Sequence, residues 1–87
     1  MYGIVAVRKT HPRDPKSGQE SYLKPGRLTD PRFTLVQSGL EKAAAALQRV
    51  QVWENTEPAK AALEIVRAAV ERREKLPYEL KIVAMPQ

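Results

Sequence analysis

The order of the predicted secondary-structure segments most constrains the fold of this chain. Three short segments rich in β-branched and aromatic residues come first: YGIVAVRKT (2–10), ESYLK (20–24) and RFTLVQ (32–37). Two stretches with helical spacing follow, and YELKIVAM (78–85) closes the chain with period-two alternation, which is typical of a half-buried strand. Clustered strands before helices predict an α+β fold of order β-β-β-α-α-β, in which two helices pack on one face of an antiparallel sheet of three to four strands.

Both helices are predicted from apolar residues spaced by three and four, and from capping signals. The first is expected at about 39–53, after a capping box in which Ser38 and Glu41 satisfy each other's backbone N–H groups. The second is expected at about 57–75, where Thr56 can cap the first turn and Pro58 is tolerated within it.

The connections between the strands are also predicted. HPRDPKSGQ (11–19) holds two prolines and a glycine, so it should be the loop of a hairpin, too long for a tight turn. The last strand must return to the sheet because its apolar face has no other partner. Leu80 and Ile82 are expected to be buried, whereas Glu79 and Lys81 are expected to be exposed. The order of strands in the sheet is left open.

Length and composition limit the class of protein. Eighty-seven residues are expected to form one domain, 1–87, near the lower size limit for independent folding. Without cysteine the chain has no disulfide and no thiolate metal site, which suits a reducing compartment. It has no apolar run near the ~20 residues that span a bilayer and no signal peptide at its start. We therefore expect a soluble protein of the cytoplasm, without a membrane partner.

The positive charge is concentrated in the first third of the chain. Between positions 8 and 32, seven basic residues face three acidic ones, whereas the remainder has eight basic and seven acidic residues. Such an asymmetry suggests a surface for an anionic partner. The candidate partner-binding residues are Arg8, Lys9, Arg13, Lys16, Tyr22, Lys24, Arg27 and Arg32. The 11–19 loop beside them is predicted to be mobile.

Three aromatic residues on the predicted strands allow two interpretations. Tyr2, Tyr22 and Phe33 could point inward and form the core. They could instead lie on a free sheet face among the basic residues, where bases of a single-stranded nucleic acid would stack. The pattern alone leaves both open.

Catalysis and metal binding are not expected. His11 is the only imidazole, and Asp14 alone does not complete a zinc site beside it. The carboxylates of the second helix alternate with basic residues, as on a solvated helix face; they are Glu57, Glu64, Glu71 and Glu74. No nucleophile motif, phosphate loop or metal cluster is present in the sequence. We therefore expect no catalytic residues, no metal, no cofactor and no enzymatic activity.

Several short pieces resemble a group of known sequences. VAVRK, YLKPGRLTD, RFTLVQS, EKAAAAL and LKIVAM, in this order, are similar to small uncharacterised proteins encoded by tailed bacteriophages and prophages. The resemblance spans most of the chain, but it brings no established activity and no catalytic residues. A second, weaker resemblance is to three-stranded-sheet DNA-binding domains, where Arg8, Lys24, Arg27 and Arg32 would contact DNA, although their dense arginine-tryptophan pattern is missing.

Two functions follow as expectations. The first is a small phage accessory protein that binds a host protein in the host cytoplasm and could inhibit a host enzyme or defence complex. The alternative is a nucleic-acid-binding module that uses the basic, aromatic-containing face of the first three strands. The first is preferred because arginines and aromatics are few for a dedicated nucleic-acid binder. The oligomeric state is left open.

Overall fold

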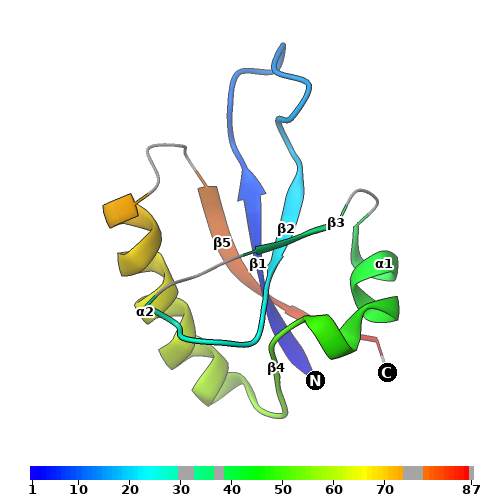
Figure 1. Cartoon of the computed structure of the whole chain (residues 1–87), viewed down its shortest axis with the longest axis vertical. Coiled ribbons are helices and arrows are strands. Elements are labelled where there is room, and N and C mark those ends of the chain that lie inside the picture. The colour runs from blue at the N-terminus through cyan, green and yellow to red at the C-terminus, as the bar shows by residue number, and fades with distance from the viewer. Residues whose placement is uncertain (30–32, 37–38, 74–77, 87) are drawn as a thin grey trace.

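A computed structural model describes residues 1–29, 33–36, 39–73 and 78–86 of the chain (Figure 1). Its elements, in chain order, are β1 (Tyr2–Arg8), β2 (Glu20–Leu23), β3 (Phe33–Val36), α1 (Leu40–Ala45), the short 3-10 helix η1 (Leu47–Arg49), β4 (Val52–Trp53), α2 (Thr56–Arg73) and β5 (Tyr78–Ala84). All pairings between the strands are antiparallel. The α+β class, the antiparallel sheet and the two helices are therefore confirmed.

β1 is the central strand of the sheet. Along one edge it pairs with β4 at Tyr2 and Gly3 and with β2 from Val5 to Val7. Along the other edge it pairs with β5 over its whole length, from Tyr2 opposite Ala84 to Arg8 opposite Tyr78. β3 lies outside β2 and extends the sheet on that side. The predicted return of the last strand to the sheet is confirmed.

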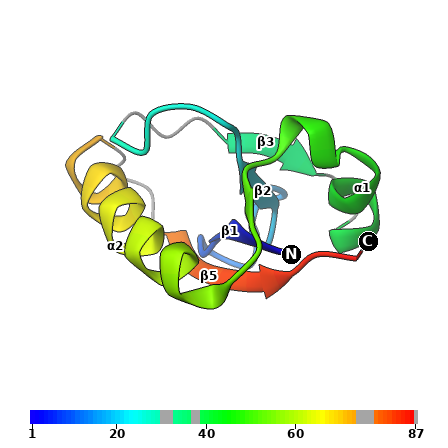
Figure 2. The ribbon, with the colours of Figure 1, turned by 90° about the horizontal axis from the view of Figure 1, so that it is seen from below.

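The two helices cover opposite faces of the sheet, which corrects the predicted one-face arrangement (Figure 2). Val5 and Val7 of β1 belong to a buried cluster with Ala43 of α1. Ile4, the residue before Val5, belongs to a second cluster with Val66 of α2. Successive strand residues point to opposite faces. An all-apolar IVAV run, unlike an alternating one, therefore fits a strand buried on both faces.

The first helix is shorter than the predicted 39–53. α1 ends at Ala45, and after η1 the backbone at Val50 is extended, with φ −116° and ψ 134°. The Gln51 N–H donates to the Leu23 carbonyl at 2.8 Å, and the next two residues form β4 against β1. Val50 and the two residues of β4 are β-branched or aromatic, so strand pairing prevails here over the helical spacing. The N-cap position of α1 falls on Gly39 rather than on the predicted Ser38, which lies outside the described residues.

The other predicted elements agree with the structure within a few residues. α2 begins at Thr56, and its buried residues lie at the predicted spacing: Ala59, Ala62, Val66, Ala69 and Val70. On its solvent face Glu57 pairs with Lys60 at 3.9 Å and Glu64 with Arg67 at 2.9 Å; Glu71 is exposed, and Glu74 lies outside the described residues. No helix within the described ranges is long and apolar enough to cross a membrane.

The register of β5 agrees with its predicted alternation. Leu80 and Ile82 are half-buried and pack against the α2-side cluster, whereas Glu79 and Lys81 are exposed. After the strand, Met85 is buried in the α1-side cluster, where its Sδ atom lies close to Gly3. A Cβ atom at Gly3 would come within 3.3 Å of that sulfur, so a larger residue there would require the Met85 side chain to shift slightly.

Candidate interaction surface

The β1–β2 hairpin forms one end of the molecule, and its loop is ordered by its own hydrogen bonds (Figure 1). The Arg8 N–H donates to the Gln19 carbonyl at 3.1 Å, and the Gly18 N–H donates to the Arg8 carbonyl at 2.7 Å, which closes the loop. Inside it, the Asp14 N–H donates to the His11 carbonyl at 2.8 Å, and the Ser17 N–H donates to the Asp14 carbonyl at 3.0 Å. The loop is thus a series of turns rather than an extended segment.

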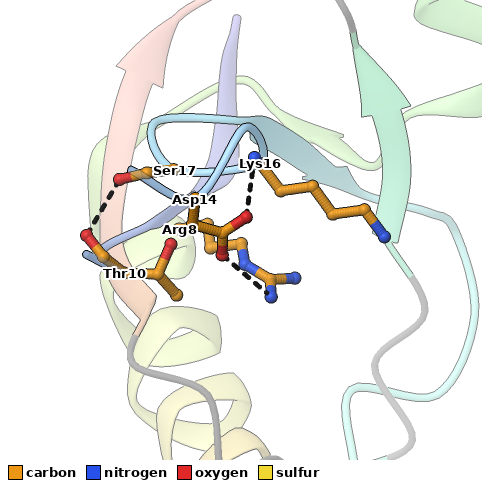
Figure 3. A network of polar contacts seen from close by, with 5 residues as sticks. All are labelled: Arg8, Thr10, Asp14, Lys16 and Ser17. Carbon is orange, nitrogen blue, oxygen red and sulfur yellow. Dashed lines mark hydrogen bonds and ion pairs between the residues drawn. The ribbon is translucent and has the colours of Figure 1, made fainter. Parts of the chain in front are cut away.

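Asp14 is the centre of the polar contacts within the loop (Figure 3). Its carboxylate accepts the Lys16 N–H at 2.9 Å, a turn that Asp favours before Pro15, and it also pairs with the Arg8 guanidinium at 3.5 Å. The hydrogen bond from the Lys16 backbone N–H, together with the positive charges of Arg8 and Lys16, lowers the pKa of Asp14. The loop conformation therefore includes an ionised Asp14 at neutral pH.

Two further groups hold the base of the loop. The Ser17 hydroxyl donates to the Thr10 carbonyl at 3.0 Å (Figure 3). The Arg8 side chain is 19% exposed, and its Nε atom is buried without a hydrogen-bond partner among the described residues. Arg8 was predicted to bind a partner; in the structure its Nη2 atom lies 3.5 Å from the Asp14 carboxylate. Arg8 lies at the base of the loop, where its backbone hydrogen bonds and its contact with Asp14 help to hold the loop conformation.

The remaining predicted residues fall into two groups at opposite ends of β2. Lys9, Arg13 and Lys16 are exposed on the hairpin loop, whereas Lys24 and Arg27 are exposed in the segment that follows the other end of the strand. The four residues of β2 span roughly 13 Å. The sequence interpretation treated these residues as one basic surface, whereas the structure separates them into two groups by the length of β2. Arg32 lies outside the described residues.

Tyr22 does not belong to either exposed group. It is 1% exposed in the α1-side cluster, and its hydroxyl donates to the Glu20 carboxylate at 3.4 Å. Burial, together with the adjacent Glu20 charge and this hydrogen bond, raises the pKa of Tyr22 to about 12. Phe33 is half-buried in the other cluster, 6.2 Å from the Tyr78 ring, and Tyr2 is half-buried in β1. Of the two interpretations of these aromatics, Tyr22 fits the core.

His11 takes part in the turn and in nothing else that the structure describes. It is exposed, and its Nδ1 atom accepts the Arg13 N–H at 3.1 Å. Within the described residues, no three histidine, aspartate or glutamate side chains lie close enough together to hold a metal ion.

The loop carries a shallow depression of about 300 Å³, lined by Pro15, Lys16, Ser17, Gly18 and Gln19. From the sequence, Gly18 was counted among the residues that predict a loop, Asp14 was considered only as a metal ligand, and Ser17 was given no role. The Asp-Pro dipeptide and Gly18 are turn signals in the sequence, and Gly18 adopts a positive φ of 83° in the structure.

The comparisons with known proteins bring no relative. No protein-family model, no curated protein and no solved structure matches the chain. The function has to be argued from the geometry of the hairpin.

Proposed function

We propose that this chain is a non-enzymatic binding protein whose hairpin loop docks onto an acidic surface of a partner protein. The observation that carries the proposal is a projecting loop that is held by its own hydrogen bonds and that exposes Lys9, Arg13 and Lys16. A loop that is already ordered loses less conformational entropy on binding than a disordered one. Exposed charges at its tip accelerate the encounter with an oppositely charged surface.

The resemblance to phage-encoded proteins makes a host protein the partner of choice. The protein would then act in the host cytoplasm, and a partner with an acidic functional surface, such as an enzyme or a defence complex, would be inhibited when the loop covers that surface. Nucleic acid is the alternative partner, because a two-stranded hairpin fits the major groove of DNA. Stacking of nucleic-acid bases on a free sheet face is disfavoured, because Tyr22 is buried and helices cover both faces of the sheet.

The test compares two double variants with equal charge. Arg13→Ala with Lys16→Ala and the control, Lys24→Ala with Arg27→Ala, each lower the net charge from +5 to +3. Both pairs are exposed, so each should leave the free energy of unfolding within about 0.5 kcal/mol of the parent. They differ in position, at the hairpin loop or beyond the other end of β2.

The tagged protein is first used to isolate its partner from nuclease-treated bacterial lysate, and the affinity of each variant for that partner is then measured at low and high salt. The hairpin variant should bind roughly 2- to 30-fold more weakly, mainly through slower association, and high salt should mask the difference. The control should bind like the parent. If both variants lose the same affinity, the effect comes from net charge and not from the position of the residues. If the folded hairpin variant binds like the parent, the assignment of the loop is refuted.

A parallel titration with duplex DNA distinguishes the alternative. If nucleic acid is the partner, each lost phosphate contact should lower the slope of log affinity against log salt by about one. A protein partner that survives nuclease treatment, with weak and sequence-independent DNA binding, supports the proposal.

A further inference from the structure

β5 is an edge strand with an unpaired outer side. Among the described residues, β1 is the only strand that pairs with it. The Met85 N–H donates to the Met1 carbonyl at 2.7 Å, which fixes the phase of the ladder. In an antiparallel pair, backbone groups point alternately toward and away from the neighbouring strand. The N–H and C=O groups of Tyr78, Leu80 and Ile82 therefore point away from β1.

The other edge of β1 shows the same phase. The Arg8 N–H donates to Gln19 on the β2 side, so the even residues of β1 direct their backbone groups to β2 and the odd residues to β5. The ladder partners of those odd residues are the odd residues of β5, such as Lys81 opposite Val5. The even residues of β5 thus direct their backbone donors and acceptors to the outer edge of the sheet, where no other strand of the described residues pairs with them.

The side chains on this edge are charged in a self-complementary pattern. Glu79 and Lys81 are exposed on the α1 side of the sheet and carry opposite signs. Glu79 pairs with Lys9 at 3.2 Å, whereas Lys81 has no carboxylate within 4.0 Å in the described part of the chain. On the α2 side, Leu80 and Ile82 are half-buried. Edge charges usually prevent strand pairing between molecules, but two opposite charges can also select one register.

We propose that two copies of this protein pair through antiparallel β5 strands, with Leu80 of one copy opposite Leu80 of the other. In this register Glu79 lies opposite Lys81 of the second copy, and the reciprocal pair forms as well. These are non-hydrogen-bonded positions, where side chains approach most closely. Centring the pair on Lys81 or on Glu79 would place two like charges opposite each other.

The same register satisfies the backbone and the apolar face. The outward N–H and C=O groups of Leu80 meet those of the second Leu80, and those of Tyr78 meet those of Ile82. On the α2 side these side chains continue the apolar surface of one sheet into the other. The dimer uses the edge of β5 and the proposed function uses the hairpin loop, so the dimer does not depend on the proposed function; the two surfaces share the Lys9–Glu79 contact.

Charge reversal tests the pairing. Light scattering after size exclusion should show the parent approaching twice the mass of one chain as its concentration rises toward about 1 mM. Glu79→Lys and Lys81→Glu should each weaken association roughly tenfold or more, because both cross-strand pairs become repulsive. An equimolar mixture of the two variants should associate again, because each repulsive charge then meets its opposite. Lys60→Glu, an equal charge change on the exposed face of α2, should associate like the parent.

Cysteine pairing tests the register and does not require strong association. The chain has no native cysteine, so each introduced thiol is unique. A mixture of Glu79→Cys and Lys81→Cys should form a mixed disulfide under mild oxidation, because side chains at non-hydrogen-bonded positions are close enough to bridge. Each variant alone should remain mostly reduced, because the introduced cysteines of two identical copies are not opposite each other in this register; they are offset by two residues along the paired strands.

The proposal is overturned by a parent that stays monomeric across this concentration range and gives no mixed disulfide. It is equally overturned by a dimer that charge reversal does not weaken, or by one in which Lys81→Cys bridges to itself more readily than to Glu79→Cys. Thermal unfolding of each variant at low concentration confirms that the chain is folded. A variant that is unfolded is replaced by the double exchange of Glu79 and Lys81, which should associate like the parent.

Discussion

Replacing Val5 by threonine tests whether the α1 side of the sheet is free of water. Val5 is 1% exposed, and its neighbours in the cluster include Tyr22, Ala43 and Met85. Threonine has nearly the same shape and also suits a strand, so the change exchanges one methyl group for a hydroxyl. If both helices covered only the other face, this side of the sheet would be solvated and the substitution would be almost neutral.

The expected cost follows from the burial of that hydroxyl. A buried hydroxyl without a hydrogen-bond partner costs about 1–3 kcal/mol. A domain of this length has a total free energy of unfolding of about 4–13 kcal/mol, so the loss is a large share of it. The midpoint of thermal unfolding should fall by about 4–24 °C.

Urea unfolding followed by far-UV circular dichroism and by the fluorescence of Trp53, the single tryptophan, measures the loss directly. Ile65→Thr is the matched control, since Ile65 is β-branched but 43% exposed on α2, and it should cost less than about 0.5 kcal/mol. A Val5→Thr protein as stable as this control would refute the dry α1-side cluster and the opposite placement of the helices.

Two further predictions concern single residues. The phenol of Tyr22 should ionise near pH 12, which is measured as the phenolate absorbance that is lost in Tyr22→Phe. Because folding raises this pKa above its usual value of 10, the unfolded chain loses the proton first. The free energy of unfolding should therefore fall as pH rises from 10 to 12. An ordinary titration near pH 10 would contradict its burial. Leu80→Ala should lower the free energy of unfolding by about 2 kcal/mol, which is at the low end for a leucine truncation because Leu80 is only half-buried. Lys81→Ala should change the free energy of unfolding by less than about 0.5 kcal/mol at low protein concentration. The reverse result would mean that the register of β5 is wrong by one residue.

The sequence predicts the elements of this fold better than their arrangement. The alternation in the last strand predicts which of Leu80 and Lys81 is turned inward, because one face of an edge strand still meets solvent. The all-apolar run at Val5 carries no such alternation, and it could have indicated a strand covered on both sides. The choice between one covered face and two depends on where the helices return, which only the tertiary structure decides.

The prediction that the first helix continues to about residue 53 was wrong for a related reason. Helical spacing grouped five residues on one face, and all of them except Ala44 contact one cluster: Leu40, Ala43, Ala44, Leu47 and Val50. An extended segment can place Val50 there equally well, and the vacant edge of β1 beside β2 offers β4 its backbone partners. That edge is not visible in local sequence.

The candidate site was predicted in part. Composition identified the basic residues of the loop, because a charge excess is visible without coordinates. It could not separate Lys16 from Lys24, which β2 places at opposite ends, or recognise that Asp14 engages Arg8.

The central position of β1 sets a constraint on the order of folding during synthesis. β1 is synthesised before the other elements described here, and its hairpin with β2 can close early because the loop between them is short. The strand that covers its other edge, β5, is synthesised after the other elements described here, and it pairs with β1 from Tyr2 opposite Ala84 onward. Non-local pairing of this kind is slow to form, and an open apolar strand edge favours aggregation. A nascent chain halted before Tyr78 therefore carries an apolar strand with one bare edge, and it is the species with the greatest need of a chaperone.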